Sequence, residues 1–322
     1  MLQARLGLAR LSLFGLLLTG CVRVGERVPI ALEGLTFVAA GPCKIADSVD
    51  CKTVRPLLVD RFEVTRSAWL EVARGKRDLR LPEVYTAGWD ADTARLPATG
   101  MTLDQARDFA ASRGMRLPTV TEWMRIAAGA GAQRWPWGVV DQKSAANTSD
   151  LGLGRLAPVG TFGNGNTSAR VSDMLGNAAE WVESPLSNLV GSSPKGPSQV
   201  PAVLPSLASG ASLGSLAAWA MGGAYTDRQR PLHSSDQKGV RFHARELDPR
   251  HRSTTVGLRC VTDAESYLWV KAAEFSSPEL YEAVRAVGRT WGVPAAGLLE
   301  DLAERPGAPV GLRWLLEGVR GE

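Results

Sequence analysis

Cysteine and histidine are scarce in this chain, and so are the signatures of common catalytic sites. Its 322 residues include four Cys and three His, so a soft or borderline metal ion has few candidate ligands. There is no H-E-x-x-H zinc pattern, no phosphate-binding loop and no Gly-rich dinucleotide turn. There is also no long run of Lys or Arg, which disfavours a nucleic-acid partner. Composition therefore indicates no enzyme class.

The first twenty residues predict an export signal. They contain Arg5 and Arg10, no acid, and an apolar stretch over residues 11–18, much shorter than the roughly 20 residues of a spanning helix. The ending LTGC is similar to a bacterial lipobox, which implies that Cys21 becomes the first mature residue and carries lipid. A plain signal peptide with an accidental Cys is the alternative. By resemblance to enterobacterial sorting signals, Val22 in place of Asp favours the outer membrane. We therefore expect an envelope protein anchored in the membrane through its N-terminal lipid, with a tether over residues 21–29.

Export changes how charge and cysteine are interpreted. Removal of residues 1–20 takes away two Arg and no acid, which lowers the formal net charge from +4 to about +2. Cys43 and Cys51 enclose a short polar stretch, and an oxidising compartment favours a disulfide bond between them; two unrelated thiols are the alternative. Cys260 lies in a β-type run and is expected to be a buried structural thiol.

Apolar patterning predicts helices and strands separated by many irregular segments. Capping boxes, Thr102 with Gln105 and Thr119 with Glu122, each precede apolar residues at helical spacing. Strand-like runs occupy residues 35–40, 55–65, 157–162, 178–184, 218–225 and 256–261.

Two further regions differ in composition from the rest. Residues 184–216 are rich in Ser, Pro, Gly and Ala and predict a flexible surface insertion. Residues 270–322 predict a small helical appendage, whose first helix would begin at a capping box of Ser276 and Glu279. We expect this appendage to pack through Trp291 and Trp314 as an accessory that the main domain can fold without.

The central motifs resemble, in order, those of the formylglycine-generating enzyme (sulfatase-modifying factor) family. They span roughly residues 30–262 and read DRFEVTRSAWLEV, RLPTVTEW, RWPWG, APVGTF, DMLGNAAEWVES, AMGGAY and VGLRCV. The resemblance implies the irregular α+β fold of that family, which is related to C-type lectin-like domains and has little regular secondary structure.

In DMLGNAAEWVES, two acids lie on either side of a Gly-Asn pair. The resemblance implies a structural Ca²⁺ bound by the side chains of Asp173 and Glu180 and by the carbonyls of Gly176 and Ala178. Mixed carboxylate and carbonyl ligands suit Ca²⁺, and glycine lets the backbone turn toward the ion. A Gly-Asn turn with two solvated acids is the alternative. By the same resemblance, the second calcium site of the family would fall near Asn147, Thr148 and Asp150, although the sequence between there and APVG is shortened.

The copper site of the family's enzymes has no counterpart in this sequence. Those enzymes bind Cu(I) through two Cys shortly before the strand that corresponds to VGLRCV, and soft thiolates select this ion. Here residues 227–259 contain no Cys, and Cys260 matches the strand Cys instead, so a copper–thiolate site is not expected. The same stretch contains His233, His243 and His251, which could hold zinc, copper or iron; the alternative is surface or loop His among many Arg.

Two functional hypotheses from different classes follow. The first is a lipid-anchored, non-catalytic member of the family that binds an envelope protein or glycan. The second is an oxidoreductase of the family with an altered metal site built from the three His. The missing Cys pair favours the first, because one thiol cannot form a two-coordinate copper site.

Overall fold

The computed structural model describes residues 32–45, 49–50, 53–74, 76–79, 91–131, 133–183, 218–236 and 239–322. The expected signal peptide, Cys21, the tether, Cys51 and the 184–216 insertion lie outside these residues. Within the described residues, no helix is both long and apolar enough to cross a membrane.

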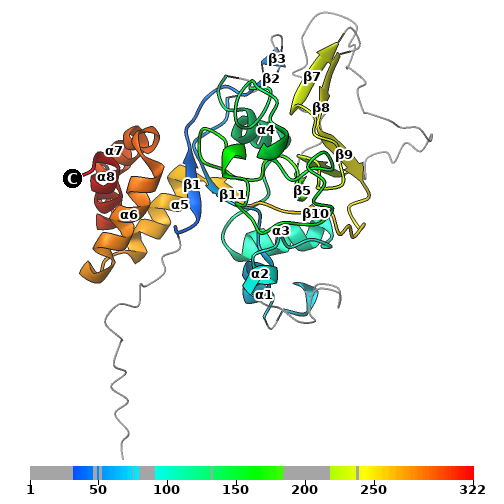
Figure 1. Cartoon of the computed structure of the whole chain (residues 1–322). Coiled ribbons are helices and arrows are strands. Elements are labelled where there is room, and N and C mark those ends of the chain that lie inside the picture. The colour runs from blue at the N-terminus through cyan, green and yellow to red at the C-terminus, as the bar shows by residue number, and fades with distance from the viewer. Residues whose placement is uncertain are drawn as a thin grey trace, which may run out of the picture.

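Two small sheets occupy the centre of the molecule (Figure 1). In the first, β4 (Leu57–Asp60) lies between β1 (Leu35–Val38) and β11 (Val261–Asp263) and is antiparallel to both. The second has the order β10-β5-β6-β9, and β5 pairs with β10 in parallel and with β6 antiparallel. Its strands are Val256–Gly257 for β10, Ala179–Val182 for β5, Ala218–Met221 for β6 and Ala244–Leu247 for β9.

Two hairpins project from this centre. One pairs β2 (Lys44–Ile45) with β3 (Val49–Asp50), and the other pairs β7 (His233–Asp236) with β8 (Gly239–Phe242), which leads directly into β9 (Figure 1). Strands account for only part of the expected runs: residues 157–162 form no strand, which corrects that expectation. Instead Val159 exchanges hydrogen bonds with Arg95 in an irregular segment.

The helices between the sheets begin where their capping residues predict. Thr102 starts α3 (Leu103–Ser112) and Thr119 starts α4 (Val120–Ala128), both with complete capping boxes, so these two predictions are confirmed. Trp69 of α1 (Arg66–Ala73) stacks on Phe109 of α3, with ring centroids 4.8 Å apart. The other short helices among the described residues are α2 (Ala91–Ala94) and 3₁₀ turns at Arg77–Leu79, Lys143–Ala145, Gly163–Gly165, Ala272–Glu274, Pro278–Leu280 and Val293–Ala295.

The C-terminal helices pack against the first sheet and share its core. They are α5 (Ala264–Lys271), α6 (Tyr281–Trp291), α7 (Ala296–Ala303) and α8 (Val310–Arg320), and they cover the side of β1 (Figure 1). The Trp291 indole N–H donates to the Leu35 carbonyl at 2.9 Å, and leucines of α7 and α8 join the same apolar cluster as Leu58 and Leu258. These helices are thus a layer of the main core and more than an accessory.

The start of α6 differs from its sequence prediction. The 3₁₀ turn Pro278–Leu280 comes first, with Ser277 before it and no side-chain cap, and α6 begins only at Tyr281. The expected capping box of Ser276 and Glu279 is therefore wrong, because the turn satisfies its backbone groups through i→i+3 bonds instead.

Candidate functional site

The loop before β5 has an unusual backbone. Asp173, Gly176 and Asn177 have positive φ angles of 58°, 78° and 57°. A Cβ atom at position 176 would lie 2.3 Å from the Asn147 carbonyl oxygen, so only glycine fits there. The Asn177 N–H donates to that same carbonyl at 2.8 Å, and the Gly176 N–H donates to the Gly222 carbonyl at 3.0 Å. These contacts hold the loop between two distant segments and turn its polar side chains inward.

Glu180, on β5, forms a fully buried ion pair with Arg259. The guanidinium donates to both carboxylate oxygens, with its shortest N···O distance 2.7 Å, and the exposed fractions of the two side chains are 1% and 0%. The Trp123 indole N–H donates to Glu180 Oε2 at 2.7 Å. Arg259 also donates to the carbonyls of Asp60 and Ser172, both at 2.8 Å. One guanidinium therefore joins both sheets to the loop.

Glu63 adds a second buried carboxylate, which the sequence analysis missed. Its oxygens accept hydrogen bonds from Asn177 Nδ2 at 2.6 Å and from the Ala178 N–H at 2.8 Å. Burial raises the pKa of Glu63 well above its ordinary value, and the nearby carboxylates of Asp173 and Glu180 raise it further. In the sequence, Glu63 could have been noticed as an acid flanked by the apolar residues Phe62 and Val64 of the FEVT motif.

Asp173 is the third carboxylate of this buried cluster. Its Oδ2 accepts a hydrogen bond from the Gly160 N–H at 2.6 Å, yet burial raises its pKa to about 6. Three buried carboxylates thus lie near one guanidinium, and the excess negative charge favours the protonated forms of Asp173 and Glu63. We call Glu63, Asp173, Glu180 and Arg259 the buried charge cluster.

The four proposed calcium ligands do not fit a calcium ion in this arrangement. Both oxygens of Glu180 are taken by N–H donors of Arg259 and Trp123, so this carboxylate cannot face an ion without losing them. Arg259 already supplies the positive charge that a metal would bring. Asp173 and Gly176 lie in the same loop, but the described contacts show no common centre for the set with Ala178.

The residues of the proposed second calcium site differ in their exposure to solvent. Asn147 and Thr148 are buried, and Asn147 Oδ1 and Thr148 Oγ1 have no hydrogen-bond partner within the described part of the chain. Asp150 is exposed, and its carboxylate accepts from the Gln229 N–H at 2.8 Å. This site stays a sequence prediction.

The three His occupy different environments. His243 packs on the Gly222–Gly223 turn, and burial lowers its pKa to about 4, so its ring is neutral at pH 7. His233 is buried on β7, whereas His251 lies exposed in the loop after β9. Among the described residues, no group of three or more His, Cys, Asp or Glu side chains is placed to hold a metal ion.

The described cysteines are both buried. The Cys260 N–H donates to Asp60 Oδ2 at 3.1 Å, and burial raises the pKa of the thiol well above its ordinary value, with Asp60 adding to the rise. Cys43 is buried as well, but Cys51 lies outside the described residues, so the disulfide stays a prediction.

Replacing Asp173 by Asn should stabilise the protein near pH 7.5. The folded-state pKa of Asp173 is raised to about 6, against about 3.9 in an unfolded chain. The protonated side chain therefore contributes its full share to the stability of the fold below pH 4, and this share is lost as the pH rises through 6. Asn keeps the left-handed backbone and the Gly160 bond without the charge. We expect a gain on the order of 1–3 kcal/mol at pH 7.5 and little change at pH 4, by urea unfolding.

Exposed Asp108 supplies the matched control, since Asp108→Asn should leave the curve unchanged. Calcium chelation should not move the melting temperature of the parent protein. Lower stability of the Asp173→Asn variant at pH 7.5, together with a chelator-sensitive parent, would mean that Asp173 holds a cation.

Comparison with known proteins decides the family. A sequence model of the sulfatase-modifying factor enzyme 1-like domain matches residues 26–264, well over half of the chain. The chain belongs to this family. The fold of this sulfatase-modifying-factor-like protein is also similar to the crystal structure of CarF, with a TM-score of 0.51 and 19% identity over 73% of this chain and 98% of that one. PvdO from Pseudomonas aeruginosa gives 0.50 and 17%, over 74% and 98%.

Curated relatives of this sulfatase-modifying-factor-like protein include hercynine oxygenases. That of Mycolicibacterium smegmatis is 37% identical over 94 residues, which cover 28% of this chain and 22% of the relative. That of Mycobacterium tuberculosis is 35% identical over 146 residues, covering 40% and 34%. The chain therefore spans about a third or less of the length of these relatives.

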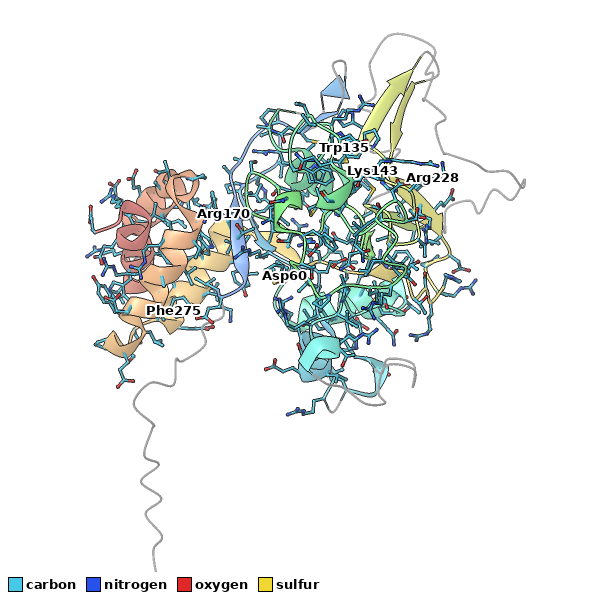
Figure 2. The ribbon with its side chains drawn as sticks, in the orientation of Figure 1. Asp60, Trp135, Lys143, Arg170, Arg228 and Phe275 are labelled. Carbon is cyan, nitrogen blue, oxygen red and sulfur yellow. The ribbon has the colours of Figure 1, made fainter. Side chains whose placement is uncertain are left out.

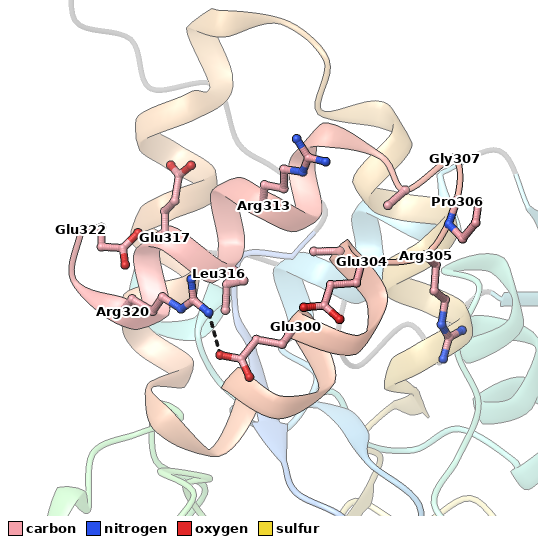
Figure 3. A pocket seen from close by; sticks show the side chains of 12 residues that line it. Glu300, Glu304, Arg305, Pro306, Gly307, Arg313, Leu316, Glu317, Arg320 and Glu322 are labelled. Carbon is pink, nitrogen blue, oxygen red and sulfur yellow. Dashed lines mark hydrogen bonds and ion pairs between the residues drawn. The ribbon is translucent and has the colours of Figure 1, made fainter.

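A groove outside the family match offers no comparable site. It measures about 620 Å³ and lies between α7 and α8 (Figure 3). Two of its arginines form ion pairs within the protein, Arg320 with Glu300 at 2.8 Å and Arg305 with Glu265 at 2.7 Å. The Tyr281 hydroxyl donates to Glu317. The groove is lined by four Glu and three Arg and lies outside the residues that match the family, so we place no chemistry there.

Proposed function

We propose that this sulfatase-modifying-factor-like chain is a non-catalytic binding domain of the cell envelope, anchored by lipid at Cys21. The proposal depends on where the four cysteines lie in the sequence. With one Cys reserved for lipid and two at the start of the domain, only Cys260 remains near the region where the family's enzymes hold copper. It is fully buried and its thiol pKa is raised, so it is poorly suited to act as a thiolate.

The segment where the thiolate pair would fall contains a structural ion pair instead. Asp227 accepts two hydrogen bonds from Arg245 at 2.7 and 2.9 Å and one from the Ala224 N–H at 2.8 Å. Its carbonyl accepts from the Ser149 N–H. These contacts tie the segment after β6 to β9 and to the loop at 149, which supports a scaffold role for these residues.

A copper-loaded mature protein should therefore produce no formylglycine on a sulfatase-type Cys peptide. Oxidation of a thiol by the family's enzymes requires Cu(I) on two thiolates, and no such pair is available. An aldehyde-detection assay under oxygen measures this, with copper alone as the background. Turnover above that background contradicts the non-catalytic proposal.

The second candidate is an oxidoreductase with an altered metal site at His233, His243 and His251. Two observations favour it: the relationship to hercynine oxygenases and the neutral ring of His243, since a metal binds the neutral imidazole. Elemental analysis after loading with iron, zinc or copper separates the candidates. Stoichiometric metal in the parent protein that is lost in His233→Ala and His243→Ala supports the oxidoreductase. A metal content below stoichiometry in the parent protein contradicts it.

A further inference from the structure

Two loop segments, residues 134–155 and 228–232, form one continuous surface. The Leu232 N–H donates to the Arg134 carbonyl at 3.0 Å. Gln229 bridges the segments a second time, because its backbone N–H donates to Asp150 and its side-chain amide donates to Asp141 at 2.5 Å. Figure 2 shows Lys143 and Arg228 on the same side of the molecule, as these contacts require. We call these two segments together the basic-apolar face.

Exposed apolar side chains concentrate on this face. Val139 and Val140 are 76% and 62% exposed, and Leu151 and Leu153 are also exposed. They lie beside a stacked pair of indoles, Trp135 and Trp137, whose ring centroids are 5.5 Å apart. The Trp137 indole N–H donates to the Val140 carbonyl, which fixes the loop in this exposed position. Apolar side chains that are exposed to solvent on an ordered loop are typical of an interaction surface.

The charge of the same face is strongly one-sided. It has five exposed cations, Arg134, Lys143, Arg155, Arg228 and Arg230. None of them forms an ion pair with another part of the chain that the structure describes. The only acids of the face are Asp141 and Asp150, and Gln229 donates a hydrogen bond to each of them. With five cations against two acids, the face has a formal net charge of +3.

From this combination we propose that the basic-apolar face is the binding surface of the domain and that its partner is an acidic polypeptide segment with aliphatic side chains. Charge complementarity selects the acidic partner, and the exposed side chains of Val139 and Val140 provide apolar contact. The inference rests on the proposed function, for which it names the surface and the partner class. The face lies on a different side of the molecule from β1 and the C-terminal helices (Figures 1 and 2).

A direct binding measurement tests the proposal. The mature chain with Cys21→Ser, which keeps it free of lipid, is titrated into a short fluorescent peptide of alternating Glu and Leu. We expect binding that weakens with salt, and no binding of the matched peptide with Lys in place of Glu. The double variant Arg228→Ser/Arg230→Ser should weaken binding about three- to tenfold. Val139→Ser/Val140→Ser should weaken it by a similar factor.

The matched control is Arg74→Ser/Lys76→Ser, which removes two exposed cations with the same spacing at a remote position and should leave binding unchanged. Equal binding of the acidic and basic peptides, or of the parent and the Arg228→Ser/Arg230→Ser variant, overturns the proposal. Binding to phosphatidylglycerol vesicles without peptide binding would make this a membrane face, and self-association in sedimentation would make it a contact between copies; either result also overturns it. Formylglycine turnover would contradict the proposed function but leave this binding result unaffected.

Discussion

Replacing Arg259 by alanine is expected to lower the free energy of unfolding by about 3–5 kcal/mol, the typical cost of breaking a buried ion pair. The variant leaves Glu180 without its counter-ion at a site with 1% exposure, beside two further carboxylates. It also leaves the carbonyls of Asp60 and Ser172 without their donor. Urea unfolding followed by tryptophan fluorescence at pH 7 measures the loss.

A compensating variant separates charge from packing at this site. In Glu180→Gln/Arg259→Met, the amide oxygen still accepts from the Trp123 indole, while no buried charge is left without a partner at this position. We expect it to recover much of the stability lost in Arg259→Ala, because replacing both members of a buried pair is often nearly neutral. As a surface control, Arg250→Ala breaks the exposed pair with Asp248 and should leave the unfolding midpoint unchanged. A stable Arg259→Ala protein would show that protonation of the carboxylates alone balances the cluster.

The second large effect concerns the C-terminal helices. Trp291→Ala should cost about 3–5 kcal/mol, because it leaves a cavity at the junction of α6 and β1 and removes the donor to the Leu35 carbonyl. The centroid of the Trp291 ring also lies 6.4 Å from the ring centroid of Phe37 on β1. Truncation after residue 265 should therefore unfold the domain, since it uncovers one face of the first sheet.

Trp314 is the internal comparison for Trp291. It is only half-buried and meets Tyr281 edge-on at 5.4 Å, so Trp314→Ala should cost about 1 kcal/mol. Thermal unfolding of the two variants and of the truncated chain distinguishes the alternatives. If the truncated chain melts cooperatively at the parent temperature, the helices are an accessory after all.

Local sequence signals were sufficient for much of the fold. The boxes at Thr102 and Thr119 start helices because their side chains satisfy backbone donors three residues away, an interaction that needs no distant partner. The order of the motifs was enough for the family and its α+β fold, now shown by the match over residues 26–264. Residues 157–162 failed as a strand, because the apolar pattern alone does not provide a pairing partner.

Two features of the site depended on the tertiary structure. Asp173 and Glu180 were candidates through the family resemblance, but the role of Glu180 follows from Arg259, 79 residues further along the chain. Glu63 enters the same cluster from a segment more than 100 residues earlier in the chain, and burial beside the other carboxylates raises its pKa. Contacts across such separations are set by the packing of the two sheets, which no local pattern records.

The amino-acid sequence by itself determined the family, the two capped helices and the absence of Cys from residues 227–259. These follow from residue identity and short spacing. Only the tertiary structure decided that a guanidinium takes the central position of the buried charge cluster and that α6–α8 complete the core. It also brought residues 134–155 and 228–232 into one basic-apolar face. The physical reason is that burial and charge balance are properties of groups brought together by folding, and each group alone carries neither.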